Sequence, residues 1–174
     1  MATVRADAAR NRAKVLEAAR ELFAEQGFEV PLDEIAARAE VGPGTVYRHF
    51  PTKQALFQAV TEERVAAMIA TAGEPSNDPG AALFAFLGRM ADEAAVKRDL
   101  SDAITVPTEL RKSMQAAIGT LLTDAQQAGA VRADITAVDL VALMKGLMQS
   151  MQEGANPQVL LEIVLRGLQS SRKP

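Results

Sequence analysis

The sequence contains no cysteine, no tryptophan and a single histidine, and only 4% of its 174 residues are aromatic. Without cysteine there are no disulfide bonds and no thiolate metal sites, and one histidine disfavours an imidazole-rich metal site. The chain also lacks the run of roughly 20 apolar residues that would span a bilayer, and no signal-peptide pattern opens it. We therefore expect a soluble cytoplasmic protein that uses neither a metal ion nor a cofactor.

The composition favours helices, because alanine and leucine dominate and 48% of the residues are hydrophobic. A net charge of −3 argues against indiscriminate nucleic-acid binding, which usually needs a strongly basic domain. However, Arg5, Arg10, Arg12 and Lys14 face a single Asp7 at the start of the chain. Such a basic arm ahead of the first helix can follow phosphates or enter a minor groove, although a solubilising, disordered terminus fits the same residues.

Helix-ending residues divide the first part of the chain. Apolar positions repeat at helical spacing over residues 10–26, and Gly27 stands where a C-terminal glycine would end that helix, with Phe28 folding back on its last turn. A second helix is expected from Pro31 to about Glu40. Together with the helices that follow, it should enclose a small core. The expected core residues are Leu22, Phe23, Ile35, Val46, Phe50, Leu56, Phe57 and Val60.

The stretch VGPGTVYRHFPTKQAL, residues 41–56, holds a tight turn and a short helix over residues 45–50. Thr52 then caps a fourth helix that runs from Lys53 to about Ala72. The short helix buries Val46 and leaves a polar, aromatic and cationic surface free. That arrangement suggests DNA recognition in a major groove, while the corner of a helical bundle with a solvated face fits the spacing equally well.

Residues 12–60, and above all the run TVYRHFPTKQAL, resemble the N-terminal domain of the TetR family of bacterial transcriptional regulators. The resemblance covers the helix-turn-helix and both flanking helices. It implies that Pro43, Gly44 and Thr45 lie at the N-terminal end of the recognition helix, close to base edges.

The same resemblance assigns further DNA contacts. It implies that Tyr47, His49 and Lys53 contact backbone phosphates, the last from the start of the fourth helix. Arg48 would contact a base or a phosphate.

Two positions depart from the family pattern. Much of the family has glycine where this chain has Glu40, and serine or threonine where it has Pro31. If the turn needs a positive φ at position 40, glutamate costs on the order of 1 kcal/mol there. Pro31 removes a hydroxyl that could cap the second helix and touch a phosphate. Both changes leave the details of the phosphate contacts open.

The run GEPSNDPG, residues 73–80, reads as a linker, with Asp78 as the N-cap of the next helix. Further helices are expected from Pro79 to Arg98, from Pro107 to Gly129, over residues 137–152, and from Asn156 to Ser170, with a short helical or turn segment over residues 99–106. We therefore predict an all-α fold of about nine helices. We expect residues 1–52 to form the arm and the helix-turn-helix, residues 53–72 a connecting helix that completes the DNA-binding domain, and residues 73–174 an effector-binding and dimerisation domain.

The last two expected helices are apolar around more than half of their circumference, although a helix that faces only its own core needs a narrower stripe. Gly146 and Gly167 would let another helix approach closely. We expect a homodimer through these two helices, the arrangement that the family resemblance implies, with a wholly intramolecular core as the alternative. The C-terminal half also resembles the SbtR-like subgroup.

The resemblance implies a ligand-gated repressor, which a small-molecule effector releases from a palindromic operator in double-stranded DNA. Apolar side chains could line the effector pocket or simply fill the core. The candidates are Phe86, Met90, Met114, Ile118 and Met148. An enzyme is disfavoured, because no phosphate-binding loop or paired-carboxylate pattern stands out. The alternative function is a dimeric helical small-molecule-binding protein without DNA-binding activity.

Overall fold

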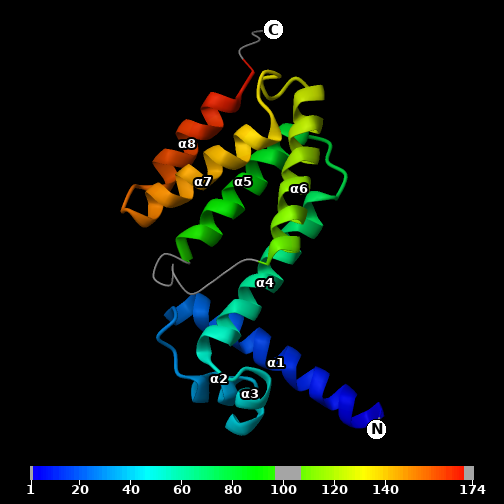
Figure 1. Ribbon diagram of the computed structural model, residues 1–174, viewed down its shortest axis with the longest axis vertical. Coiled ribbons are helices and arrows are strands. Elements are labelled where there is room, and N and C mark those ends of the chain that lie inside the picture. The colour runs from blue at the N-terminus through cyan, green and yellow to red at the C-terminus, as the bar shows by residue number, and fades with distance from the viewer. Residues whose placement is uncertain (1, 97–106, 171–174) are drawn as a thin grey trace. The chain divides into compact units, whose positions relative to one another are not determined.

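The computed structural model describes residues 2–96 and 107–170, and these residues form eight α-helices (Figure 1). The helices are α1 (Ala2–Gln26), α2 (Leu32–Arg38), α3 (Pro43–His49), α4 (Lys53–Ala72), α5 (Pro79–Val96), α6 (Thr108–Gln127), α7 (Ala137–Gln152) and α8 (Pro157–Leu168). The all-α prediction is confirmed. The count of about nine included a segment over residues 99–106, which lies outside the described residues.

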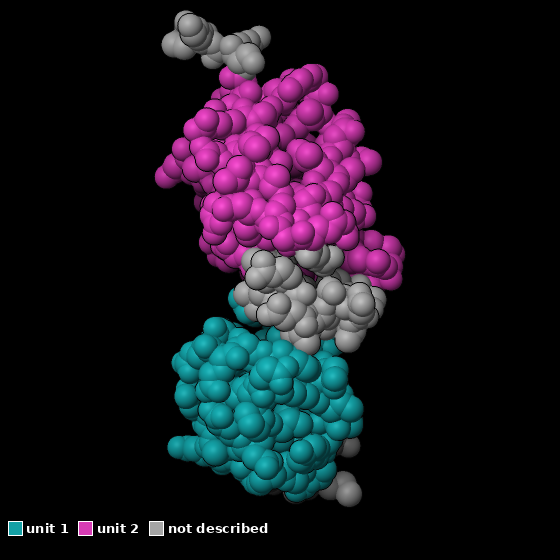
Figure 2. Space-filling model, turned by 90° about the vertical axis from the view of Figure 1, so that its left-hand side faces the viewer, with its two compact units in different colours: residues 1–64, 102–105 teal, residues 65–101, 106–174 magenta. Residues whose placement is uncertain are grey.

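The chain divides into two compact units, one ending at Arg64 and the other beginning at Val65 (Figure 2). The division falls inside α4, so this helix contributes its first turns to one unit and its last turns to the other.

The first unit packs α1, α2 and α3 with the start of α4. All the core residues expected from the sequence are buried here, with exposed fractions between 0 and 4%. One expectation was wrong. The residues ahead of Arg10 were predicted to form an arm, but α1 begins at Ala2. The reason is that residues 2–9 are rich in alanine and contain neither glycine nor proline, so the helix continues through them.

Turns of the first unit follow the local rules read from the sequence. Gly27 ends α1 with a φ of 74°, and the Phe28 ring returns to lie 6.2 Å from the Phe23 ring. Glu40 has a φ of 54°, so the turn does require the left-handed conformation at this position. Pro31 is the N-cap of α2 rather than its first helical residue.

The second unit packs α5 against α6, α7 and α8, and the last turns of α4 join the same core through Met68 and Ala72. Its helices α5, α7 and α8 begin at residues whose side chains cap them, whereas Pro107 precedes α6 without a side-chain cap. Asp78 accepts a hydrogen bond from the backbone N–H of Ala81 at 2.9 Å, and Asn156 caps α8 in the same way. Both caps were predicted.

The end of the described chain pairs with the loop after α6. Val131 and Gln169 form an isolated antiparallel bridge, because the Arg132 N–H donates to the Leu168 carbonyl at 3.0 Å and the Ser170 N–H donates to the Ala130 carbonyl at 3.2 Å. The last helix therefore ends at Leu168 rather than at Ser170 as predicted, since the chain becomes extended where this pairing begins.

No helix in the described part of the chain combines the length and the apolar character needed to cross a membrane.

Candidate nucleic-acid interface

A tight turn joins α2 to α3. Ala39 closes α2, Glu40 adopts its left-handed conformation, and the Val41 N–H donates to the Ala36 carbonyl at 3.0 Å. Gly42 is the N-cap of α3, and Pro43 occupies the first helical position, where no intrahelical N–H bond is needed. The two short helices and this turn are the parts of a helix-turn-helix.

One side of α3 is buried and the other is open. Val46 is fully buried, and Phe50, the C-cap residue, is 3% exposed. The predicted DNA-contacting residues lie on the remaining surface. Pro43, Gly44, Tyr47 and Arg48 are exposed, and Thr45 and His49 are half-buried.

Among the described residues, Tyr47 is one of five large hydrophobic side chains that are exposed, with 50% of its surface accessible. Such an amphipathic ring on a polar helix face can bind a phosphate through its hydroxyl. Arg48 folds back along the helix, because its Nε donates to the Gly44 carbonyl at 3.0 Å. This bond uses one guanidinium N–H and holds the group toward the N-terminal end of α3, where the remaining donors can reach a ligand.

Lys53 is the first residue of α4, and Thr52 caps that helix by accepting a hydrogen bond from the Ala55 N–H at 3.1 Å. The Lys53 ammonium lies over the Phe28 ring, 4.7 Å from its centroid. A cation and the open N–H groups of a helix start together form a surface that attracts phosphate.

Most other cations of the first unit are paired with carboxylates. Arg10 pairs with Asp7, and the Lys14 ammonium lies 3.6 Å from the Glu40 carboxylate. Arg12 lies 3.8 Å from the Glu63 carboxylate and stacks over a phenylalanine ring. Three of the basic residues expected to follow phosphates, Arg10, Arg12 and Lys14, thus each lie beside a carboxylate of the same unit.

Of the effector-pocket candidates in the second unit, Phe86, Met90 and Ile118 are buried, with exposed fractions of 0, 8 and 1%. Met114 and Met148 are partly buried against the same core.

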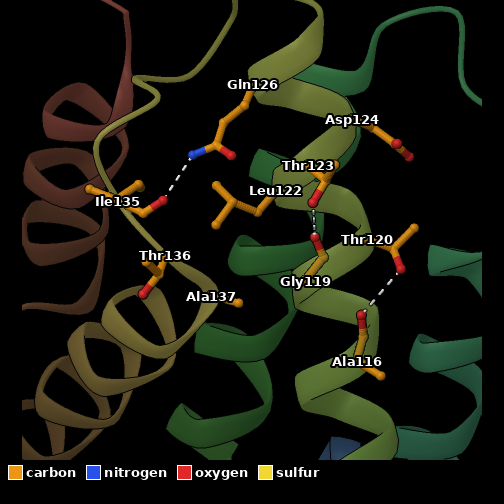
Figure 3. Close-up of a pocket in the computed structure, with 10 residues that line it drawn as sticks. All are labelled: Ala116, Gly119, Thr120, Leu122, Thr123, Asp124, Gln126, Ile135, Thr136 and Ala137. Carbon is orange, nitrogen blue, oxygen red and sulfur yellow. Dashed lines mark hydrogen bonds between the residues drawn. The ribbon is translucent and has the colours of Figure 1, made fainter.

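A hollow of about 580 Å³ lies elsewhere in the second unit, between α6 and the start of α7 (Figure 3). Thr120 and Thr123 turn their hydroxyls back to carbonyls of their own helix, and the Gln126 amide donates to the Ile135 carbonyl at 3.0 Å. Sequence reasoning missed this hollow. The polar residues spaced along one side of α6 were its only signal.

An arginine and an aspartate form a close pair in the loop before α7. Arg132 donates to both carboxylate oxygens of Asp134, at 2.6 and 2.5 Å, and this lowers the pKa of Asp134 to about 2. At the start of α7, Asp139 completes a capping box with Thr136, whose hydrogen bonds lower the pKa of the Asp139 carboxyl. Both carboxylates stabilise the loop between α6 and α7.

Helices α7 and α8 leave apolar side chains exposed. Val138, Leu143, Val159 and Ile163 are 66, 45, 51 and 63% exposed. On α8, Val159 and Ile163 stand one helical turn apart, and Gly167 continues the same row. Space beside the helix glycines is open, because a Cβ atom added at Gly146 or Gly167 would meet nothing within 4 Å. This is the unpaired apolar surface that the sequence predicted.

Among the described residues, no group of three or more histidine, cysteine, aspartate or glutamate side chains is arranged to hold a metal ion.

Curated relatives match about a third of the chain. The transcriptional regulator UidR of Escherichia coli is 39% identical over 61 residues, which cover 34% of this chain and 31% of that protein. The match thus spans about a third of the length of this curated relative.

Solved structures match over nearly the whole chain. A TetR regulatory protein from Mycobacterium vanbaalenii is 41% identical, with 95% of this chain and 99% of that one covered and a TM-score of 0.69. A TetR regulator from Streptomyces coelicolor is 32% identical, with 92% and 99% covered and a TM-score of 0.70.

Two family profiles divide the chain. Residues 15–60 match the bacterial regulatory proteins of the tetR family, and residues 78–170 match the C-terminal domain of SbtR-like transcriptional regulators. This is a family of transcriptional regulators and not of enzymes. With its helix-turn-helix, its helical second unit and both profile matches, the chain belongs to the TetR family and carries an SbtR-like C-terminal domain.

Proposed function

We propose that this protein is a sequence-specific DNA-binding transcriptional regulator that acts in the cytoplasm. The observation that carries the proposal is the open face of α3, with Tyr47 and Arg48 exposed and Lys53 beside it at the start of α4. The first residues of α3 would contact base edges, and Tyr47, His49 and Lys53 would contact phosphates. In functional terms, residues 1–52 form the helix-turn-helix, residues 53–72 connect and complete the DNA-binding domain through Lys53, and residues 73–174 bind effector and partner.

The working form is a homodimer that pairs through α7 and α8. Exposed apolar side chains on both helices support this, because a monomer would leave Val138, Leu143, Val159 and Ile163 in water. An isologous pairing buries the same patch on both copies. Two recognition helices would then read a palindromic operator whose half-sites lie about 34–36 Å apart.

We further propose that a small-molecule effector in the second unit releases the protein from its operator, which makes it a repressor. The fold supports this, since it is shared with RolR, solved in complex with resorcinol, at 19% identity and a TM-score of 0.65. Phe86, Met90, Met114, Ile118 and Met148 are the candidate lining. Because most of them are packed into the core, an effector would bind by separating side chains that touch in its absence.

A mobility-shift assay on the DNA just upstream of the protein's own gene tests DNA binding. Tyr47→Ala and Lys53→Ala should abolish or strongly weaken the shift while the oligomeric state stays unchanged. The Lys53 variant should also lower the slope of log K against log salt by about one unit, because one phosphate contact is lost. Lys112→Ala is the matched control, since this exposed lysine of α6 also loses one charge but lies in the second unit.

If wild-type protein and both variants bound equally, the proposed docking of α3 would be wrong. If the wild type bound no DNA, a dimeric small-molecule-binding protein would become the better description.

Analytical ultracentrifugation tests the dimer. Ile163→Lys should yield monomers with reduced operator affinity, because it places a charge in the proposed interface. Gln115→Lys adds the same charge on an exposed position of α6 and should leave the dimer intact. An undisturbed Ile163→Lys dimer would show that α8 does not pair as proposed.

A further inference from the structure

Three phenylalanines of the first unit form a connected cluster. The Phe23 and Phe57 rings meet at 5.0 Å between centroids, nearly edge to face, and the Phe28 ring lies 6.2 Å from the first and 5.6 Å from the second. Phe23 and Phe57 are buried, whereas Phe28 is half-buried. Contacts with two buried rings hold Phe28 in place at the edge of the core.

The Phe28 ring makes a cation–π contact with Lys53. The Lys53 ammonium lies over this ring at 4.7 Å from the centroid, where the negative face of the π-system attracts it. Lys53 opens α4, a position at which the helix dipole disfavours positive charge. The ring thus compensates in part for an unfavourable placement.

Lys53 differs from its cationic neighbours in the kind of partner it has. Arg10, Arg12, Lys14 and Arg38 each lie within 4.0 Å of a carboxylate. Among the described residues, none of the ion pairs involves Lys53. A carboxylate would cancel the charge, whereas an aromatic ring orients the ammonium and leaves its charge and its N–H donors available.

We propose that Phe28 is a positioning residue for DNA binding, which holds the Lys53 ammonium at the start of α4 in the place where it meets a backbone phosphate. The inference rests on the proposed function and deepens it. Lysine has a flexible four-carbon stem, and ordering that stem when DNA binds weakens the contact. A ring that already restricts the stem reduces this loss.

The path of the chain explains why residue 28 can do this. Gly27 ends α1 in the left-handed conformation, with a φ of 74°, and the reversal brings the next residue back against Phe23. The end of α1 therefore supplies the surface on which the first side chain of α4 rests.

The test is a double-mutant cycle on operator affinity, measured by fluorescence anisotropy with the DNA upstream of the gene. Phe28→Leu keeps an apolar side chain but removes the ring, and it should weaken binding about threefold. Its salt slope should match the wild type, because the lysine charge remains, whereas Lys53→Ala should lower the slope by about one unit. In the Lys53→Ala background, Phe28→Leu should have no further effect.

Two controls separate positioning from packing. Phe23→Leu removes another ring of the same cluster that does not contact the lysine, so it should lower the melting temperature without a comparable loss of affinity. Phe28→Tyr retains the ring and should restore the wild-type affinity.

A second readout needs no DNA. In the free wild-type protein the ring current of Phe28 should shift the NMR signals of the Lys53 side-chain methylenes upfield, and Phe28→Leu should remove that shift. If wild-type protein binds the operator, either of two results would overturn the inference. One is an equal loss of operator affinity from Phe28→Leu in the wild-type and Lys53→Ala backgrounds, and the other is a Lys53 signal without the upfield shift. Failure of the wild type to bind DNA would instead refute the proposed function, and the positioning role with it.

Discussion

Replacing Glu40 should reveal how much the turn of the helix-turn-helix is strained. Glu40 has a φ of 54°, a left-handed conformation that costs a side-chain-bearing residue about 1 kcal/mol or more. Its carboxylate lies 3.6 Å from the Lys14 ammonium, but both side chains are largely exposed, at 83 and 54%. Exposed ion pairs contribute about 0–1 kcal/mol, so this pair offsets only part of the backbone cost.

Comparing Glu40→Gly with Glu40→Ala isolates the backbone term, because both variants lose the carboxylate and its ion pair. Glycine adopts a positive φ freely, while alanine keeps the strain. Glycine also raises the conformational entropy of the unfolded chain, and this offsets part of the gain in stability. We therefore expect Glu40→Gly to be more stable than Glu40→Ala by about 0.5–1 kcal/mol.

Thermal unfolding followed by circular dichroism measures this difference, which should appear as about 1–4 °C in melting temperature. Glu40→Asn is an informative third variant, because asparagine tolerates the left-handed region and should fall between the other two. An alanine variant as stable as the glycine variant would refute the reasoning, since the turn would then carry no cost at residue 40.

Other predictions concern the second unit. Gly80→Ala should lower the melting temperature of the second unit in differential scanning calorimetry, because the new Cβ would lie 2.6 Å from the Ala130 Cβ. An unchanged melting temperature would show that the loop at Ala130 moves aside without cost. Thr136→Ala removes the N-cap side chain of α7 and should lower the free energy of unfolding in urea by about 1 kcal/mol. An unchanged urea midpoint would show that this cap does not stabilise the fold. Arg132→Ala should raise the pKa of Asp134 from about 2 toward its ordinary value, as an NMR titration would record. Because the pKa of Asp134 is lower in the folded state, the wild-type pair stabilises the fold above pH about 4. That stabilisation is lost as the pH falls through about 2. Between pH about 4 and about 2, the free energy of unfolding should therefore fall less in Arg132→Ala than in the wild type.

Local signals in the sequence predicted most helix boundaries. Gly27, Thr52, Asp78 and Asn156 stand where the structure ends or begins a helix, because capping depends on hydrogen bonds within a few residues. The positive φ at Glu40 was raised only as a condition, from the glycine that much of the family has at this position, and the structure meets that condition. The helical spacing of apolar residues also predicted the core of the first unit, because each helix buries one stripe of apolar side chains.

Contacts between distant residues could not be read from the sequence. The ring of Phe28 meets Lys53 only because the end of α1 lies beside the start of α4. The hollow beside Thr123 is likewise lined by residues from both α6 and the segment that leads into α7. Similarly, the basic start of the chain looked like an independent arm. Its helical continuation follows from the alanine-rich residues 2–9, whereas the pairing of Arg12 with Glu63 depends on tertiary structure.

The arrangement of charge reconciles a net charge of −3 with DNA binding. The carboxylates of Glu63 and Glu40 lie close to Arg12 and Lys14 and repel an approaching phosphate, so these two cations should add less to affinity than unpaired ones would. Lys53 rests on a ring and keeps its charge, and Arg48 bonds to a backbone carbonyl and keeps its remaining donors. Affinity should therefore be concentrated in the few side chains that lie on or beside α3, where a phosphate contact also sets the position of the recognition helix. We therefore expect weak binding to nonspecific DNA and a selectivity that depends on the geometry of α3 more than on total charge.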